Sequence, residues 1–326
     1  YLDFYPECDL KYAGFGGTEW TTETVDSQGV SGWWTNIAVD SKGNPVMSCS
    51  RMNEALRHVA WDGTEWQLES VDEPQVGKCS AIALDSKDYS HMSYFDLGKK
   101  NLKYATWDGT AWQVATVDDD GDVGDHSDIA LDSNDYPHIS YYDQGNRSLK
   151  YAWFDGTQWS TETVDLEGNV GLWTEIAVNS LGEACISYYD KGNKDLKYAH
   201  RENGTWKIET VDSEGEVGTY TGLALDSFDR PVISYRDLDN QNLKCACWCG
   251  STWNIETVDN SGNVGEYSSL AMDADGMVHI SYMAGGKLAV MHAWKQFDQT
   301  PPGPECNTTG VSLCMQQDTF YPGDEC

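Results

Sequence analysis

A segment of the form Thr-Val-Asp, once Ser-Val-Asp, recurs along this chain at intervals of 46 or 47 residues. The copies begin at Thr24, Ser70, Thr116, Thr163, Thr210 and Thr257. Self-similarity at a fixed period of this length is typical of a protein built by repeating one supersecondary unit. The repeat therefore limits the fold before any other property is considered.

Each copy contains four short runs rich in Ile, Val, Tyr, Trp and Thr, separated by clusters of Gly, Pro, Asn and Asp. In the third copy the runs are Ile129–Asp132, His138–Tyr142, Leu149–Phe154 and Trp159–Val164. Such runs predict antiparallel strands joined by tight turns, and the Asp-Gly pair before the fourth run predicts a hairpin. Four strands in each repeat of about 47 residues predict the blade of a β-propeller.

Counting strands favours six blades. The first and fourth strands of the repeat each occur six times, and the third occurs seven times. We predict an all-β, six-bladed β-propeller of four-stranded antiparallel blades, closed by placing the N-terminal strand Glu19–Val25 beside the C-terminal set Leu270–Trp294. Closure removes exposed strand edges. The surplus third strand then joins a blade or pairs with a neighbouring molecule. Seven blades with incomplete terminal blades are the alternative.

The predicted propeller domain covers residues 1–294, and a tail of residues 295–326 containing Pro and Cys lies outside the repeat. Cys306, Cys314 and Cys326 are expected to staple this tail, together with Cys8.

The motif Leu149–Ala152, together with Trp107–Trp112, resembles a repeat of many uncharacterised secreted bacterial and archaeal propeller proteins. The resemblance covers Leu10–Trp294. The architecture is also similar to six-bladed fucose-binding fungal lectins and to sialidase-type propellers. In those lectins a recurrent Arg and Glu hold each sugar with a Trp, whereas the six arginines here do not recur at one repeat position. Asp62–Trp66 also departs from the sialidase Asp-box spacing. The resemblance thus implies a fold rather than a function.

Charge and cysteine content limit the partners. The chain has 53 acidic and 21 basic residues and a net charge of -32, which repels nucleic acid and anionic membranes. It has no apolar run long enough to span a bilayer, so membrane insertion is not expected. Ten cysteines and glycosylation sequons at Asn146, Asn203 and Asn307 predict a secreted, extracellular or cell-surface glycoprotein.

The most site-like feature is a set of residues just before the first strand of each repeat, which we call the ring positions. They are Trp34, Cys79, His126, Trp173, Tyr220 and Tyr267. A Ser or Thr follows each of them. Aromatic faces beside hydroxyl groups suit sugar rings, so Trp34, His126, Trp173, Tyr220 and Tyr267 are the candidate ligand-binding residues. Alternatively, the aromatics wedge between blades and the hydroxyls satisfy backbone groups.

Aspartates close the fourth strand of every repeat, where such residues commonly accept backbone N–H bonds in turns. They are Asp26, Asp72, Asp118, Asp165, Asp212 and Asp259. In one loop the carboxylates of Asp118, Asp120, Asp122 and Asp125 are a candidate for an irregular calcium site. The EF-hand pattern fails there, since Val123 and Ile129 stand where Gly and Glu are needed. No cofactor is required by the sequence.

Two functions follow from these features. The seven histidines are scattered and form no nucleophile–base pattern, so we expect a non-enzymatic protein. The first hypothesis is a secreted structural or interaction protein that self-associates into an oligomer or filament through terminal strand exchange. The alternative is a carbohydrate-binding lectin that uses the aromatic ring positions at the channel mouth.

Overall fold

The computed structural model describes residues 9–28, 31–50, 55–72, 76–285 and 289–296. Within these ranges every regular element is a β-strand, and no helix has the length and apolar character needed to cross a membrane. The chain forms two compact units, Tyr1–Thr163 and Val164–Cys326, and β14 runs across the boundary between them. The predicted all-β class is confirmed.

The first unit contains a two-stranded sheet followed by three four-stranded antiparallel sheets among its described residues. The two-stranded sheet is β1 (Leu10–Phe15) and β2 (Trp20–Asp26). The next sheet is β3 (Trp33–Val39), β4 (Pro45–Ser50), β5 (Leu56–Trp61) and β6 (Trp66–Ser70). The others are β7 (Val76–Leu84), β8 (Ser90–Asp96), β9 (Asn101–Trp107) and β10 (Trp112–Asp118), then β11 (Val123–Leu131), β12 (Pro137–Asp143), β13 (Ser148–Phe154) and β14 (Trp159–Asp165).

The second unit contains two four-stranded sheets and one three-stranded sheet among its described residues. The four-stranded sheets are β15 (Val170–Val178), β16 (Ala184–Asp190), β17 (Asp195–Glu202) and β18 (Thr205–Asp212), then β19 (Val217–Leu225), β20 (Pro231–Asp237), β21 (Asn242–Trp248) and β22 (Trp253–Asp259). The three-stranded sheet is β23 (Val264–Met272), β24 (Met277–Ala284) and β25 (Ala289–Gln296).

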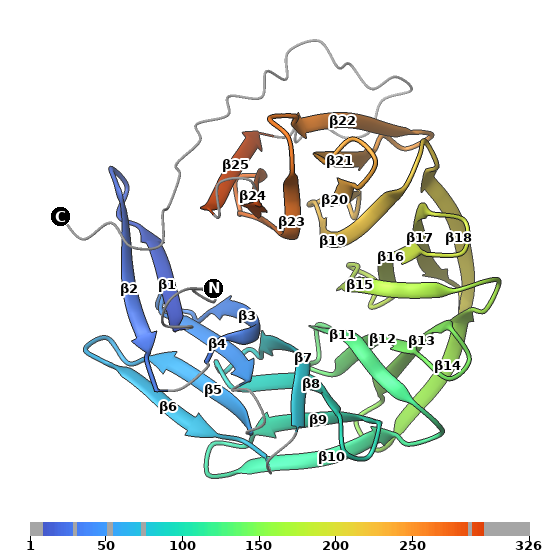
Figure 1. The fold of residues 1–326 in the computed structure, drawn as a ribbon. Coiled ribbons are helices and arrows are strands. Elements are labelled where there is room, and N and C mark those ends of the chain that lie inside the picture. The colour runs from blue at the N-terminus through green and yellow to red at the C-terminus, as the bar shows by residue number, and fades with distance from the viewer. Residues whose placement is uncertain (1–8, 29–30, 51–54, 73–75, 286–288, 297–326) are drawn as a thin grey trace. The chain divides into compact units, whose positions relative to one another are not determined.

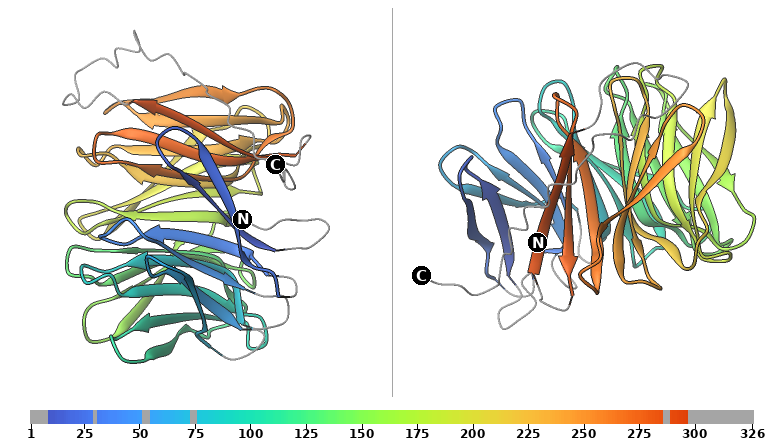
Figure 2. Two further views of the ribbon diagram at one scale, coloured as in Figure 1. Left: turned by 90° about the vertical axis from the view of Figure 1, so that its left-hand side faces the viewer. Right: turned by 90° about the horizontal axis from the view of Figure 1, so that it is seen from above.

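Within each unit the first strands of successive sheets are neighbours: β7 contacts β3 and β11, and β19 contacts β15 and β23 (Figure 1). Within each unit, successive sheets pack face to face (Figure 2) and bury a core between them. Between β7–β10 and β11–β14 this core includes Leu102, Val123, Ile139 and Tyr141, all fully buried. Each sheet therefore depends on its neighbour to hide its apolar face, as the blade prediction requires.

A glycine near the start of each long first strand permits close packing of successive sheets. Gly124 has a φ of 108°, and a Cβ at this position would lie 2.7 Å from the Cα of Leu102 on the preceding sheet. Gly218 stands in the same relation to Leu196, also at 2.7 Å. Only glycine fits both the backbone conformation and the space, which explains the Val-Gly pair in the repeat.

A buried polar group links each sheet to the next. Asp118, at the end of β10, accepts the N–H of Asp120 at 3.0 Å through Oδ1, as predicted for this turn. Its Oδ2 accepts the hydroxyl of Tyr141 at 2.6 Å and the ammonium group of Lys150, both on the following sheet. Burial raises the pKa of Asp118, but the bonds from Lys150 and Tyr141 outweigh this effect and hold it below its ordinary value.

We call this Asp–Tyr–Lys arrangement the interblade latch. It recurs in Asp72–Tyr94–Lys103, Asp165–Tyr188–Lys197 and Asp212–Tyr235–Lys244. Terminal copies differ: Asp259 accepts the hydroxyl of Tyr282, while Met291 occupies the lysine position. The latch tyrosines lie on the second strand of their sheets and are buried. Their hydrogen bonds to the aspartates were not foreseen.

The terminal strands show how the surplus third strand is used. β1 is of the third-strand type and pairs antiparallel with β2, from Leu10 opposite Asp26 to Phe15 opposite Trp20. The surplus strand thus pairs within the chain, with the strand predicted to join the C-terminal set. Cys8, Asn307, Cys306, Cys314, Cys326 and most of the tail lie outside the described residues.

Replacing Lys150 with Met, the residue found at the equivalent position 291, tests the latch. We expect the free energy of unfolding to fall by about 3 kcal/mol, because Asp118 stays buried without its cation. Urea unfolding followed by tryptophan fluorescence measures the change. Lys100→Met is the control, since the ion pair of Lys100 with Asp122 is exposed and its loss has little effect.

The pH dependence of this difference is a second measurement on the same variants. Since the pKa of Asp118 is lowered in the folded state, its contribution to stability is present above its unfolded value of about 4. That contribution is lost as the pH falls through the folded-state pKa. The stability difference between wild type and Lys150→Met should therefore shrink below about pH 4, and a difference that widens there contradicts the latch.

Candidate functional site

The ring positions share an unusual backbone conformation. All six lie in the first strand of a sheet, and their φ angles fall between 47° and 53°. The residues and angles are Trp34 (48°), Cys79 (51°), His126 (53°), Trp173 (47°), Tyr220 (53°) and Tyr267 (52°). A left-handed conformation is strained for bulky residues, and such strain is concentrated at functional sites. The six positions adopt this conformation whether the residue is Trp, Tyr, His or Cys, so the surrounding structure imposes it.

The strand bulges where the ring position lies. In β11 the pairing with β12 shifts between Val123 and Asp125 and again between Asp125 and Asp128, so His126 has no register partner. The same double shift occurs in β7, β15, β19 and β23. A β-bulge changes the direction of a side chain. Each ring residue therefore departs from the pattern in which successive side chains of a strand point to opposite faces of the sheet.

The hydroxyl residues that follow the ring positions serve the backbone. Ser80 and Ser127 donate hydrogen bonds to the carbonyl oxygens of Trp34 and Cys79, both at 3.1 Å. In the second unit, Thr221 and Ser268 donate to the carbonyl oxygens of Trp173 and Tyr220. The backbone role that the alternative gave to these hydroxyls is therefore the correct one for these four.

In the second unit the ring residues form a continuous aromatic row, which we define as Trp173, Tyr220 and Tyr267. The ring centroids of Trp173 and Tyr220 lie 5.0 Å apart, and those of Tyr220 and Tyr267 lie 4.7 Å apart. Tyr189 packs against Trp173 with centroids 5.6 Å apart. Tyr267 is the most exposed of the three residues, with 61% of its surface accessible to solvent. The second unit therefore brings together three of the five predicted ligand-binding residues.

Polar groups flank this aromatic row. Arg236 donates to Glu266 at 2.6 Å and to the side chain of Asn263 at 2.8 Å. Burial, the neighbouring Tyr267 hydroxyl and the charge of Glu266 raise the pKa of Tyr220 to about 12, against a smaller opposing effect of Arg236. Tyr220 is therefore a neutral hydroxyl at physiological pH, able both to donate and to accept hydrogen bonds.

A second polar group lies beside Trp173. The hydroxyl of Tyr189 donates to Glu216 at 2.9 Å, and Lys194 forms an ion pair with the same carboxylate at 2.7 Å. These contacts hold Tyr189 against the aromatic row. Hydrogen-bonding groups thus lie beside both Trp173 and Tyr220.

The ring positions of the first unit are chemically different. Asp125 accepts the Lys78 ammonium at 2.7 Å and the Cys79 thiol at 3.2 Å. Burial and the charge of Asp125 raise the pKa of Cys79, so its thiol is protonated and a poor nucleophile. His126 is half-buried, and burial lowers its pKa. Trp34 is 40% exposed and contacts Trp33.

The four carboxylates of the calcium candidate are distributed among separate contacts. Asp118 belongs to an interblade latch, Asp122 pairs with Lys100, and Asp125 pairs with Lys78. In the ranges that the structure covers, no three His, Cys, Asp or Glu side chains are grouped so that they could hold a metal ion. The calcium site stays a prediction, and the lysine contacts do not support it.

Two of the three sequons fall within the described residues. Asn203 is exposed in the turn between β17 and β18. Asn146 is also exposed, but its side-chain amide donates to Asp143 at 2.8 Å.

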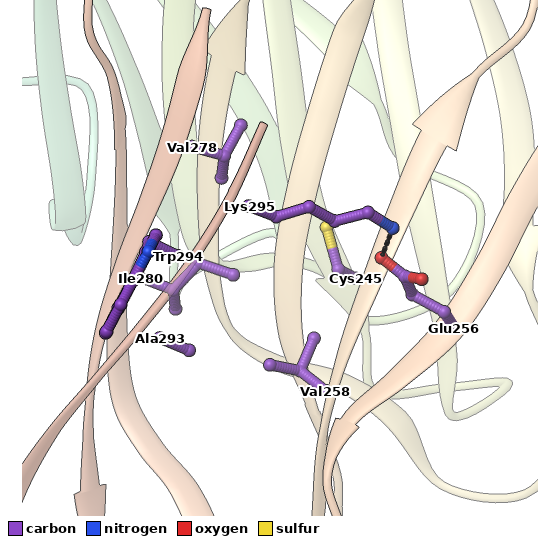
Figure 3. Close-up of a pocket in the computed structure, with 8 residues that line it drawn as sticks. All are labelled: Cys245, Glu256, Val258, Val278, Ile280, Ala293, Trp294 and Lys295. Carbon is purple, nitrogen blue, oxygen red and sulfur yellow. Dashed lines mark hydrogen bonds and ion pairs between the residues drawn. The ribbon is translucent and has the colours of Figure 1, made fainter. Parts of the chain in front are cut away.

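A small cavity in the second unit lies away from the ring positions. Val258, Val278 and Ile280 line it together with the ion pair of Lys295 and Glu256 (Figure 3). No ring residue contributes to its wall. Its mainly apolar lining, between β22 and the C-terminal sheet, marks it as a gap in sheet packing.

Sequence reasoning missed Arg236, Glu266, Tyr189 and Glu216. Arg236 follows the repeated Ser-Tyr pair of its strand, at a position that is Phe95, Tyr142 and Tyr189 in the three preceding repeats. Glu266 likewise follows the repeated Val-Gly pair, where other copies have Lys, Asp, Leu and Thr. Both positions vary inside a repeat that is otherwise nearly constant. This variation, located next to the ring positions, was the signal available in the sequence.

Comparison with known proteins shows the fold. No family model and no curated protein matches the chain. A protein of unknown function from Dyadobacter fermentans is similar in structure, with 12% identity, a TM-score of 0.59 and coverage of 78% of this chain and 91% of that one. The six-bladed fucose lectin of Aleuria aurantia has 10% identity and a TM-score of 0.54, covering 80% and 90%. A PL25 polysaccharide lyase bound to an ulvan fragment has 11% identity and a TM-score of 0.58, covering 79% and 78%.

These similarities confirm the predicted fold class, a six-bladed β-propeller, and its likeness to the fungal lectins. At this level of identity they say nothing about a shared ligand.

The strain at the ring positions can be measured at Tyr267, because its side chain is mostly exposed. Tyr267→Ala and Tyr267→Asn remove the same aromatic ring, but Asn tolerates the left-handed conformation better than Ala. We expect the Asn variant to be more stable than the Ala variant by about 1 kcal/mol in urea unfolding. Equal stability of the two variants would show that the backbone there imposes no strain.

Proposed function

We propose that this chain is an extracellular, non-catalytic glycan-binding protein whose site is the aromatic row with its polar flanks. The observation that carries the proposal is the contact of Trp173, Tyr220 and Tyr267 in one partly exposed surface. Aromatic faces bind the apolar C–H faces of sugars, while the hydroxyls of the sugar need hydrogen-bonding groups nearby. Arg236, Glu266 and the phenol of Tyr220 are such groups.

The chemistry of the site favours binding over catalysis. An acid–base catalyst needs a group whose pKa lies near the working pH. Burial shifts the pKa of Tyr220 up to about 12, and burial also raises the pKa of Tyr189. These groups stay protonated at neutral pH and serve as hydrogen-bond donors.

The saccharide ligands of two proteins with similar structures support the proposal. The Aleuria aurantia protein is a lectin with fucose recognition, and the PL25 enzyme was solved with a saccharide bound. Both are proteins of this fold that bind saccharides. Their ligands are not transferred to this chain, because the arginine pattern of the fungal lectins does not recur here. We propose the ligand class from the aromatic row alone.

A glycan array with wild type and Trp173→Ala tests the proposal. We expect wild type to bind a subset of glycans, and the variant to bind them at least about tenfold more weakly because one stacking face is lost. Tyr136→Ala is the matched control, since Tyr136 is a partly exposed aromatic residue at a turn away from the ring positions. Absence of binding to every glycan by wild type would refute glycan binding.

Self-association remains a second candidate because of one observation. The sheet β23–β25 has three strands where the five complete sheets have four, so in the described residues no fourth strand pairs with β25. Unpaired strand edges recruit other strands. If the N-terminal hairpin of a neighbouring molecule supplies the missing strand, the contact is head-to-tail and generates rings or filaments.

Deleting residues 1–15, which removes β1, tests this second candidate. We expect the particle size in light scattering to fall to that of a monomer, because the donated hairpin can no longer form. Circular dichroism of the same sample checks that the sheets remain folded. A particle size identical to wild type would exclude association through this hairpin.

A further inference from the structure

Each of three successive sheets contributes one ring to the aromatic row. Trp173, Tyr220 and Tyr267 come from β15, β19 and β23, and neighbouring rings are in direct contact. A site for one terminal sugar needs a single aromatic face enclosed by polar groups. Three contacting rings instead present an elongated apolar surface.

Polar groups lie beside two of the three rings. Arg236 and Glu266 lie close enough to Tyr220 to affect its pKa, while Tyr189 packs against Trp173 and donates to Glu216. A linear saccharide that lies along the row meets hydrogen-bonding groups beside Trp173 and Tyr220 and then the exposed ring of Tyr267. A single sugar does not cover all three rings, since neighbouring centroids are 5.0 and 4.7 Å apart.

Two buried donors next to Tyr220 are without a hydrogen-bond partner among the residues that the structure describes. In the described part of the chain, Arg236 Nε and Thr219 Oγ1 form no hydrogen bond, although both residues are almost fully buried. Thr219 directly precedes Tyr220, and Thr219 and Arg236 are register partners in the sheet. Buried unsatisfied donors are rare in native proteins and mark places where a water molecule or ligand completes the structure.

The charges indicate an uncharged ligand. The two cations at the polar flanks are already in ion pairs, Arg236 with Glu266 and Lys194 with Glu216. An acidic sugar would have to compete with these carboxylates, and it would approach a chain whose net charge is -32. A neutral sugar disrupts neither pair.

Resting on the proposed glycan binding, we propose that the ligand is an internal segment of a neutral, linear glycan, about three sugar residues long, that lies along Trp173, Tyr220 and Tyr267. The row thereby selects glycans by their length and lack of charge instead of by the identity of one terminal sugar. In the described part of the first unit the ring positions are Trp34, Cys79 and His126, and Cys79 interrupts the series of rings.

Titration calorimetry with neutral oligosaccharides of one to five residues tests the length. Cello-, xylo-, manno- and chito-oligosaccharides are the probes, with uronate oligosaccharides of equal length as the acidic set. For the neutral series that binds, we expect affinity to rise at least about tenfold from one to three residues and to change less than about twofold beyond three. We expect the acidic set to bind at least about tenfold more weakly than the neutral series.

Tyr267→Asn shortens the row by one ring while keeping a residue that tolerates the left-handed backbone. We expect this variant to lose the gain from the second to the third sugar and to keep the affinity of wild type for the disaccharide. Tyr136→Ala should reproduce the wild-type length dependence.

The outcomes separate the two proposals. If a monosaccharide binds as tightly as the trisaccharide, or an acidic oligosaccharide binds best, this inference is wrong while glycan binding stands. If no oligosaccharide of any length or charge binds and the glycan array is also blank, both proposals are wrong.

Discussion

The interblade latch is the interaction on which the rest of the structure depends. A sheet of four short strands cannot bury both of its faces, so each blade needs a fixed relation to the next. In Asp118, Tyr141 and Lys150 a carboxylate at the end of one sheet is bound by two donors of the following sheet. The charge is buried but satisfied, which makes the relation between neighbouring sheets specific as well as stable. Its repetition in Asp72, Asp165 and Asp212 gives successive sheets a common geometry.

This regular frame allows the ring positions to be irregular. The bulge, the glycine before it and the backbone hydrogen bonds are repeated, and together they hold a left-handed residue of almost any kind. Side-chain identity at these positions is therefore free to vary from blade to blade. The ring positions differ between the two units. A partly buried Lys78–Asp125–Cys79 cluster lies in the first unit, and an aromatic row lies in the second.

The predictability of these features follows from their physical origin. Strand positions depend on local propensity and turn chemistry, so the period and the strands of the third repeat were readable directly. The turn role of Asp118 was likewise local and was predicted. Its bond to Tyr141 spans 23 residues and depends on the packing of two sheets, which a single repeat does not reveal. The same holds for the site: the ring positions were found because they recur, whereas Arg236 and Glu266 were missed because they occur once.

The replacement of the latch lysine by Met291 has a consequence for motion. The sheet β23–β25 is joined to its neighbour by the Tyr282–Asp259 bond without the ammonium group that its counterparts supply. Local opening becomes easier where a stabilising contact is lost, so this sheet is expected to open more readily than it would with a lysine at position 291. Tyr267, the outermost ring of the aromatic row, belongs to this sheet. A saccharide that contacts both Tyr220 and Tyr267 would hold the two sheets together. Its binding would slow amide hydrogen exchange in the C-terminal strands.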